Sequence, residues 1–182
     1  MKFKDHIFLF ALLITLLTFS ACDDDEGVDI TEQELITTVT MTLTPEPTNV
    51  AIPFSVRDTD GPGGNAPTVD TLQLTANLTY TFSLEFLDES DANDVEDITA
   101  EVRTESDEHL VCYTASGTAV VPTITDVDKD GNPLGLTGTF TTGTPGNGSL
   151  TVRLKHQPDK SATDPCATGE TDVEVTFPVV VQ

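Results

Sequence analysis

The stretch "LTYTFSLEF", residues 78–86, decides the fold class of this chain. Its large apolar residues occupy every second position and alternate with threonine, serine and glutamate: Leu78, Tyr80, Phe82, Leu84 and Phe86. Successive side chains of a β-strand point to opposite faces, so this alternation predicts a strand with one buried face and one solvated face. Aromatic and branched residues are also favoured on a pleated, half-buried surface.

The same alternation recurs along the rest of the chain. It is clear in residues 39–43, 52–56, 150–155 and 173–181. Clusters rich in glycine, proline, asparagine and aspartate separate these segments, and such residues end strands and reverse the chain. They lie at residues 58–65, 88–94, 128–132, 143–148 and 157–169. The spacing predicts about eight to ten strands.

These strands predict an all-β antiparallel sandwich with Ig-like architecture. Strands do not alternate with helices along the sequence, which excludes a parallel α/β sheet. The chain has no tryptophan, so it lacks the tryptophan between two cysteines that marks a true immunoglobulin domain. Residues 95–102 fit a helix through Val95, Ile98 and Val102, and a strand through Ile98, Ala100 and Val102; we interpret them as a strand.

The N-terminus is typical of an exported protein. Lys2 and Lys4 precede an apolar run at residues 7–19, which is shorter than the roughly 18 apolar residues that a membrane-spanning helix needs. The run ends in "FSAC", residues 19–22, which resembles the lipobox of bacterial lipoproteins. That resemblance implies cleavage after residue 21 and acylation of Cys22, with two or three acyl chains holding the protein to a lipid bilayer.

An acidic segment, residues 23–26 ("DDDE"), follows the predicted lipidated cysteine. It resembles the export signal of Bacteroidota lipoproteins, which implies an outer-membrane protein exposed on the cell surface. The alternative is a merely solvated spacer. The predicted organisation is a signal peptide at residues 1–21, a lipidated cysteine and tether at 22–34, and one sandwich domain at 35–182.

The stretches "RDTDGPGGNAP", "DEH", "GNPLGL" and "GETDVEVTF" resemble an uncharacterised group of lipoproteins from the same kind of bacteria. That resemblance implies no established activity. The formal charge of −23 disfavours nucleic acid as a partner, because phosphate backbones would be repelled.

Once Cys22 takes the lipid, two cysteines remain in an oxidising compartment. Cys112 and Cys166 then form a predicted disulfide. The alternative is that Cys112 is a small buried hydrophobe and Cys166 a loop thiol.

Two aspartate-rich loops are candidate calcium sites, because alternating carboxylates before a glycine can wrap a hard cation. Asp126, Asp128, Asp130 and Asn132 match the first half of an EF-hand loop, although Thr137 stands where the closing glutamate belongs. The alternative is an Asp-Gly hairpin turn between residues 118–126 and 136–142.

The second candidate loop carries Asp58 and Asp60 next to several glycines, and its alternative is a plain surface loop. His109 and His156 would form a transition-metal site if their strands are neighbours; otherwise they are two lone surface histidines. "DTL", residues 70–72, resembles the O-glycosylation sequon of exported Bacteroidota proteins and makes Thr71 a candidate acceptor.

The sequence offers no nucleophile elbow, zinc-protease motif or phosphate loop. It therefore predicts a non-catalytic, lipid-anchored surface lipoprotein, an interaction or accessory module for an unknown protein or surface ligand. The alternative is a surface lipoprotein that binds a cation, either calcium or a transition metal.

Overall fold

The computed structural model describes residues 34–182 except 47, 62 and 119, together with the backbone but not the side chains of 120 and 121. The predicted signal peptide, Cys22 and nearly all of the predicted tether lie outside the described residues. Within the described part of the chain, no helix has the length and apolar character needed to cross a membrane.

Strands dominate the described chain, with one α-helix and one short 3-10 helix. The elements are β1 (Thr38–Pro45), β2 (Ile52–Arg57), β3 (Thr68–Val69), β4 (Leu72–Leu74), β5 (Thr79–Asp88), β6 (Glu96–Asp97), α1 (Ile98–Thr104), β7 (His109–Gly117), β8 (Val120–Ile124), β9 (Thr137–Thr142), β10 (Gly146–His156), η1 (Pro165–Ala167) and β11 (Glu170–Val181). The long strands coincide with the alternating segments of the sequence.

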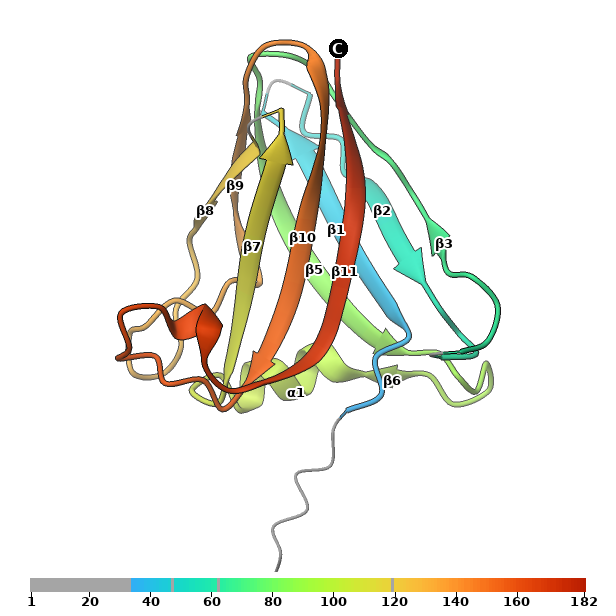
Figure 1. Ribbon diagram of the computed structural model, residues 1–182, viewed down its shortest axis with the longest axis vertical. Coiled ribbons are helices and arrows are strands. Elements are labelled where there is room, and N and C mark those ends of the chain that lie inside the picture. Colours follow the sequence, from blue (N-terminus) through green and yellow to red (C-terminus); the bar gives the residue numbers. More distant parts are fainter. Residues whose placement is uncertain (1–33, 47, 62, 119) are drawn as a thin grey trace, which may run out of the picture. The chain divides into compact units, whose positions relative to one another are not determined.

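Two sheets pack face to face, which confirms the predicted β-sandwich (Figure 1). The first sheet has the order β3-β2-β1-β5-β9-β8, with β6 pairing the end of β5. The second has the order β4-β11-β10-β7. Every pairing is antiparallel except that of β11 with the short β4.

The core lies between the sheets and consists of the alternate residues that the sequence marks as inward-facing. Tyr80, Phe82, Leu84 and Phe86 of β5 are at most 4% exposed. The Phe82 ring packs at 4.8 Å, centroid to centroid, against Phe140 of β9 in the same sheet. This burial supplies the main driving force for closing the two sheets on each other.

The predicted strand at residues 95–102 is wrong. Only Glu96 and Asp97 pair with β5, and the chain then forms the helix α1. The Asp97 carboxylate accepts the backbone N–H of Ala100 as an N-cap, and Ile98 and Val102, four residues apart, are buried. The tertiary packing of this helical face across one end of the sandwich outweighs the local preference for a strand.

Cys112 and Cys166 form the predicted disulfide, with their Cα atoms 5.9 Å apart. Cys112 lies on β7 between the core residues Val111 and Tyr113, so it points to the outer face of the second sheet. Cys166 belongs to η1. The bridge therefore fastens the loop at residues 157–169 onto the outside of the sandwich, instead of linking the two sheets as an immunoglobulin disulfide does.

Candidate metal centre

The register of β7 against β10 places His109 directly opposite His156. The two imidazole rings are stacked, with centroids 4.9 Å apart and planes 5° from parallel. Both residues share a strand face with core neighbours, Val111 on β7 and Leu154 on β10, so the pair faces the interior of the sandwich. The two strands are therefore neighbours, as the transition-metal prediction requires.

A β-bulge brings a carboxylate to this histidine pair. On β11, Thr171 pairs with Lys155 and Val173 pairs with Leu154, so Asp172 is an extra residue without a partner on β10. Its carboxylate Oδ1 lies 4.0 Å from Nδ1 of His156, and its side chain is only 2% exposed. One donor atom from each of His109, His156 and Asp172 lies within 4.8 Å of the others.

Glu34 adds a second carboxylate from the chain that enters β1. Its Oε1 lies 3.8 Å from Nε2 of His109, and its side chain is 12% exposed. We predicted residue 34 as the end of the tether, whereas it packs against the sandwich. The site thus combines residues from β7, β10, β11 and the segment preceding β1.

Hydrogen bonding leaves one nitrogen of His109 without a partner. Nδ1 lies 3.1 Å from the backbone oxygen of Glu105. Because a carbonyl oxygen can only accept a hydrogen bond, Nδ1 is the donor and carries a proton. Nε2 faces Glu34, and the His109 side chain is completely buried. Nε2 of His109, Oε2 of Glu34 and Oδ2 of Asp172 are all buried and form no hydrogen bond.

The local field around the site is negative. Burial raises the pKa of Glu34 to about 7, and repulsion from Glu101, Asp172, Glu105 and Glu96 adds to the rise. Burial also raises the pKa of Asp172, although His156 and His109 act in the opposite direction. Buried carboxylates in a negative field are stabilised by a bound cation or by protons.

The donor set fits a transition metal such as zinc. Neutral imidazole and carboxylate are zinc ligands, and donors on one tetrahedral ion lie about 3.3–3.5 Å apart because each metal–ligand bond is about 2.0–2.2 Å. The ligand atoms of His109, His156 and Asp172 lie within 4.8 Å of one another, so the widest distance between two of them would have to shorten by about 1.5 Å when the ion binds. The Glu105 carbonyl already fixes the orientation of one imidazole, as outer-shell hydrogen bonds do in metal sites.

Two aspartates of the first candidate calcium loop, Asp126 and Asp128, accept hydrogen bonds from within the loop. Both carboxylate oxygens of Asp126 accept backbone N–H groups, from Gly135 at 3.0 Å and Leu136 at 2.9 Å. Asp128 accepts the N–H groups of Asp130 and Asn132. In residues 34–182, leaving aside 47, 62 and 119, only one group of three or more His, Cys, Asp or Glu side chains lies close enough together to hold a metal ion. This group consists of His109, His156 and Asp172. The loop joins the paired antiparallel strands β8 and β9, and calcium binding by it stays a prediction.

The second candidate loop is likewise held by its own hydrogen bonds. Oδ2 of Asp60 accepts the backbone and side-chain N–H groups of Asn65, at 2.8 and 2.7 Å. Asp58 differs, because its Oδ1 is buried without a hydrogen-bond partner. Thr71, between β3 and β4, is half-buried, and its glycosylation stays a prediction.

Asp172 and Glu34 are the residues of the candidate site that sequence reasoning missed. Asp172 precedes an alternating run, but only the bulge against β10 turns it toward the histidines. Glu34 lies 75 positions before His109, and no local pattern connects the two. Finding either from sequence would require the strand register.

A scan against protein-family models found no match, and searches of the curated proteins and of the solved structures found no significant match.

Proposed function

We propose that this protein is a lipid-anchored lipoprotein of the bacterial outer surface whose sandwich binds a divalent transition-metal ion. His109, His156 and Asp172 would hold the ion, and Glu34 would lie beside it. Of the two functions that the sequence predicts, this is the cation-binding alternative. The histidine pair supports it better than the aspartate loops do, since Asp126, Asp128 and Asp60 already accept internal hydrogen bonds.

The observation that carries the proposal is the fully buried Nε2 of His109, which faces carboxylates without a hydrogen-bond partner. Polar atoms that are buried without hydrogen-bond partners cost free energy. A divalent cation would take His109 and Asp172 as ligands and would offset the charge of the Glu34 carboxylate beside it. The negative net charge of the chain favours the approach of such an ion.

We propose binding, and not turnover, as the role of this centre. The sequence offers none of the common catalytic motifs, and both histidines are accounted for as ligands. The acylated Cys22 and the acidic segment after it would keep the ion-binding domain attached to the outer membrane.

Titration with Zn²⁺ tests the metal centre. The full-length protein, stripped with a chelator and followed by calorimetry, should bind one equivalent of Zn²⁺ and unfold at a higher temperature when loaded. His156→Ala and Asp172→Asn should abolish both effects. Asp94→Asn, an exposed carboxylate in the loop after β5, is the matched control and should retain both.

Circular dichroism of each variant without metal separates loss of a ligand from loss of the fold. Folded His156→Ala protein that still binds one equivalent of Zn²⁺ would refute the assignment. Intact-mass measurement tests the anchor independently: the protein purified from membranes should begin at Cys22 and carry acyl chains, and Cys22→Ser should release it from the membrane.

A further inference from the structure

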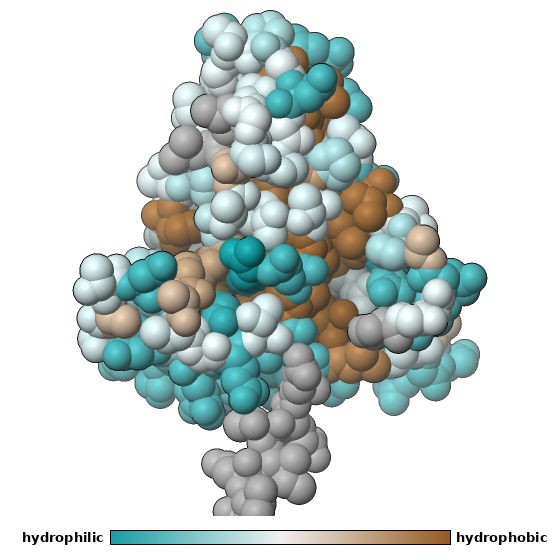
Figure 2. All heavy atoms as spheres, in the orientation of Figure 1, coloured by the Kyte–Doolittle hydropathy of each residue, from teal (hydrophilic) through white to brown (hydrophobic). Residues whose placement is uncertain are grey.

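A cavity of about 540 Å³ lies at the open side of the sandwich, between the first sheet and β11. One wall comes from the segment before β1, from β1 and β2, and from the loop that leads to β3, and the other wall comes from residues 172–176 of β11. Figure 2 shows apolar surface around a hollow on the side of the molecule where β2 and β3 lie. This volume lies within the usual range of ligand sites.

Among the residues that the structure describes, the wall made by β11 is a strand edge without a pairing partner. β11 pairs with β10 from Glu170 to Val181 except at the bulged Asp172, but on its other side β4 pairs only with Val179, Val180 and Val181. Five successive residues, 172–176, line the cavity. Because successive side chains of a strand point to opposite faces, a continuous run of lining residues indicates that the backbone edge of β11 faces the cavity. An edge of this kind presents free N–H and C=O groups to an incoming strand.

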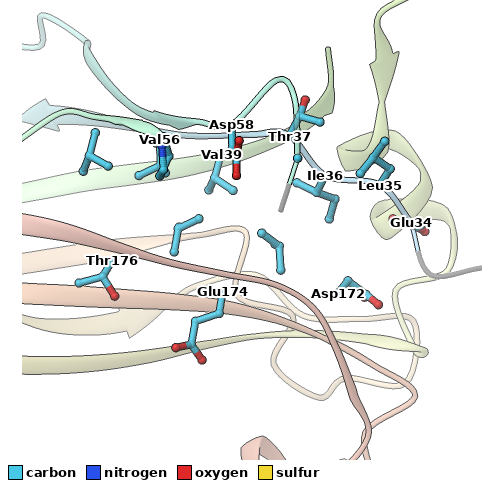
Figure 3. Close-up of a pocket in the computed structure, with 15 residues that line it drawn as sticks. Glu34, Leu35, Ile36, Thr37, Val39, Val56, Asp58, Asp172, Glu174 and Thr176 are labelled. Atoms are coloured by element: carbon cyan, nitrogen blue, oxygen red, sulfur yellow. The ribbon is translucent and has the colours of Figure 1, made fainter. Parts of the chain in front are cut away.

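The opposite wall is apolar and regularly spaced. Val39 and Val56 are paired across β1 and β2 and point toward β11 in Figure 3, and Ile36 lies on the same side. Glu174 and Thr176 point to the outer side in the same view, so Val173 and Val175, which alternate with them, face inward. Valine and isoleucine on both walls suit the apolar side chains of an inserted strand.

Every titratable residue that lines the cavity is acidic: Glu34, Asp58, Asp172 and Glu174. The Asp172 side chain is only 2% exposed, and its Oδ2 has no hydrogen-bond partner. Oδ1 of Asp58 is also buried without one, and Figure 3 shows this carboxylate pointing into the cavity. Unpaired buried carboxylates on an apolar wall favour a cationic group on the occupant.

We propose that this cavity receives an extended, basic segment of a partner protein, which adds a strand to the free edge of β11. Backbone hydrogen bonds to residues 172–176 would supply affinity, and alternate apolar side chains would pack on Val39, Val56 and Val175. A lysine or arginine of the segment would pair with Asp58. A second copy of this chain is disfavoured as the partner, because two molecules of charge −23 repel each other.

This inference goes beyond the metal centre, although Asp172 and Glu34 belong to both sites. Asp58 belongs to the cavity and not to the metal donors, whereas His156 is a metal donor and does not line the cavity. Substitutions at these two residues therefore test the two proposals separately.

The probe is a synthetic, end-blocked octapeptide in which valine and lysine alternate, labelled for fluorescence anisotropy and added to the full-length protein. It should bind, and a peptide with glutamate in place of each lysine should bind at least tenfold more weakly. A peptide with N-methylated backbone nitrogens, which cannot pair with an edge, should lose binding in the same way. Asp58→Asn should weaken the lysine peptide about tenfold, as expected for one charge-assisted hydrogen bond.

Asp94→Asn is the matched control for charge, and it should bind the lysine peptide as the wild type does. His156→Ala should also retain peptide binding, even where it loses Zn²⁺. Hydrogen exchange should report slower exchange of edge-facing amides within residues 172–176 when the peptide is bound. Equal affinity for lysine and glutamate peptides, no binding of either, or unchanged exchange at β11 would each overturn the proposal.

Discussion

The buried ion pair between Lys160 and Asp128 yields the sharpest stability prediction. Nζ of Lys160 lies 2.8 Å from Oδ2 of Asp128 and also donates to the backbone oxygen of Ser106 at 2.7 Å. The Asp128 side chain is completely buried, and the Lys160 side chain is 8% exposed. The pair ties the loop between β10 and β11 to the loop between β8 and β9. We predict that Asp128→Asn destabilises the protein by about 3–5 kcal/mol at pH 7, because it leaves a buried ammonium without its counter-ion.

The pH dependence of this effect follows from the pKa of Asp128. Burial by itself would raise that pKa, but Lys160 and the backbone N–H groups of Asn132 and Asp130 outweigh burial and lower it from 3.8 to about 2. The folded protein therefore binds this proton more weakly than the unfolded chain does. The ionised Asp128 carboxylate therefore makes its full contribution to the stability of the folded state above the pKa of the unfolded chain, near 4. This contribution is lost as the pH falls through the folded-state pKa of about 2. A depression of nearly two pKa units corresponds to about 2 kcal/mol.

Urea unfolding at pH 7 and at pH 2 measures this contribution. The stability difference between wild type and Asp128→Asn should shrink by about 2 kcal/mol on acidification, since asparagine does not titrate. Asp107→Asn is the matched control: it breaks the surface pair with Lys129, whose side chain is 63% exposed, and should change stability little at either pH. A difference between wild type and Asp128→Asn that stays constant from pH 7 to pH 2 would show that the buried pair does not set the pKa.

Three further outcomes are expected. Reduction of the Cys112–Cys166 disulfide, which spans 54 residues, should lower the free energy of unfolding by about 4 kcal/mol in the chain-entropy description, as measured by denaturation with and without reductant. Thr99→Val should cost about 1–3 kcal/mol in urea unfolding, because the buried N–H of Phe86 loses its 2.8 Å acceptor, and Thr99→Ser should restore most of the loss. Asp130→Asn should leave the melting temperature unchanged in calcium and in chelator, since this exposed residue is not among the loop's internal acceptors; a calcium-dependent shift in the wild type that this variant lacks would revive the calcium site.

The strands could be predicted from the sequence because their signal is local. Alternation in residues 78–86 and 173–181 depends only on the pleat of a strand, and the aspartate-glycine turns depend only on short-range backbone conformation. The disulfide also followed from counting cysteines once Cys22 was assigned to the lipid. Residues 95–102 were mispredicted because their apolar residues fit the spacing of a helix and also that of a strand. The burial of Ile98 and Val102 against the sandwich favours the helix.

The candidate metal centre illustrates what sequence leaves open. His109 and His156 were visible as residue types that bind metals, but their encounter depends on the β7–β10 register. Asp172 joins them through a single extra residue in β11, and Glu34 approaches His109 from the segment that precedes β1. Residue types and local periodicity thus predicted the strands, their faces and the disulfide. Only the tertiary structure decided which donors meet and which edge stays unpaired, because register and sheet order arise from contacts between residues far apart in the chain.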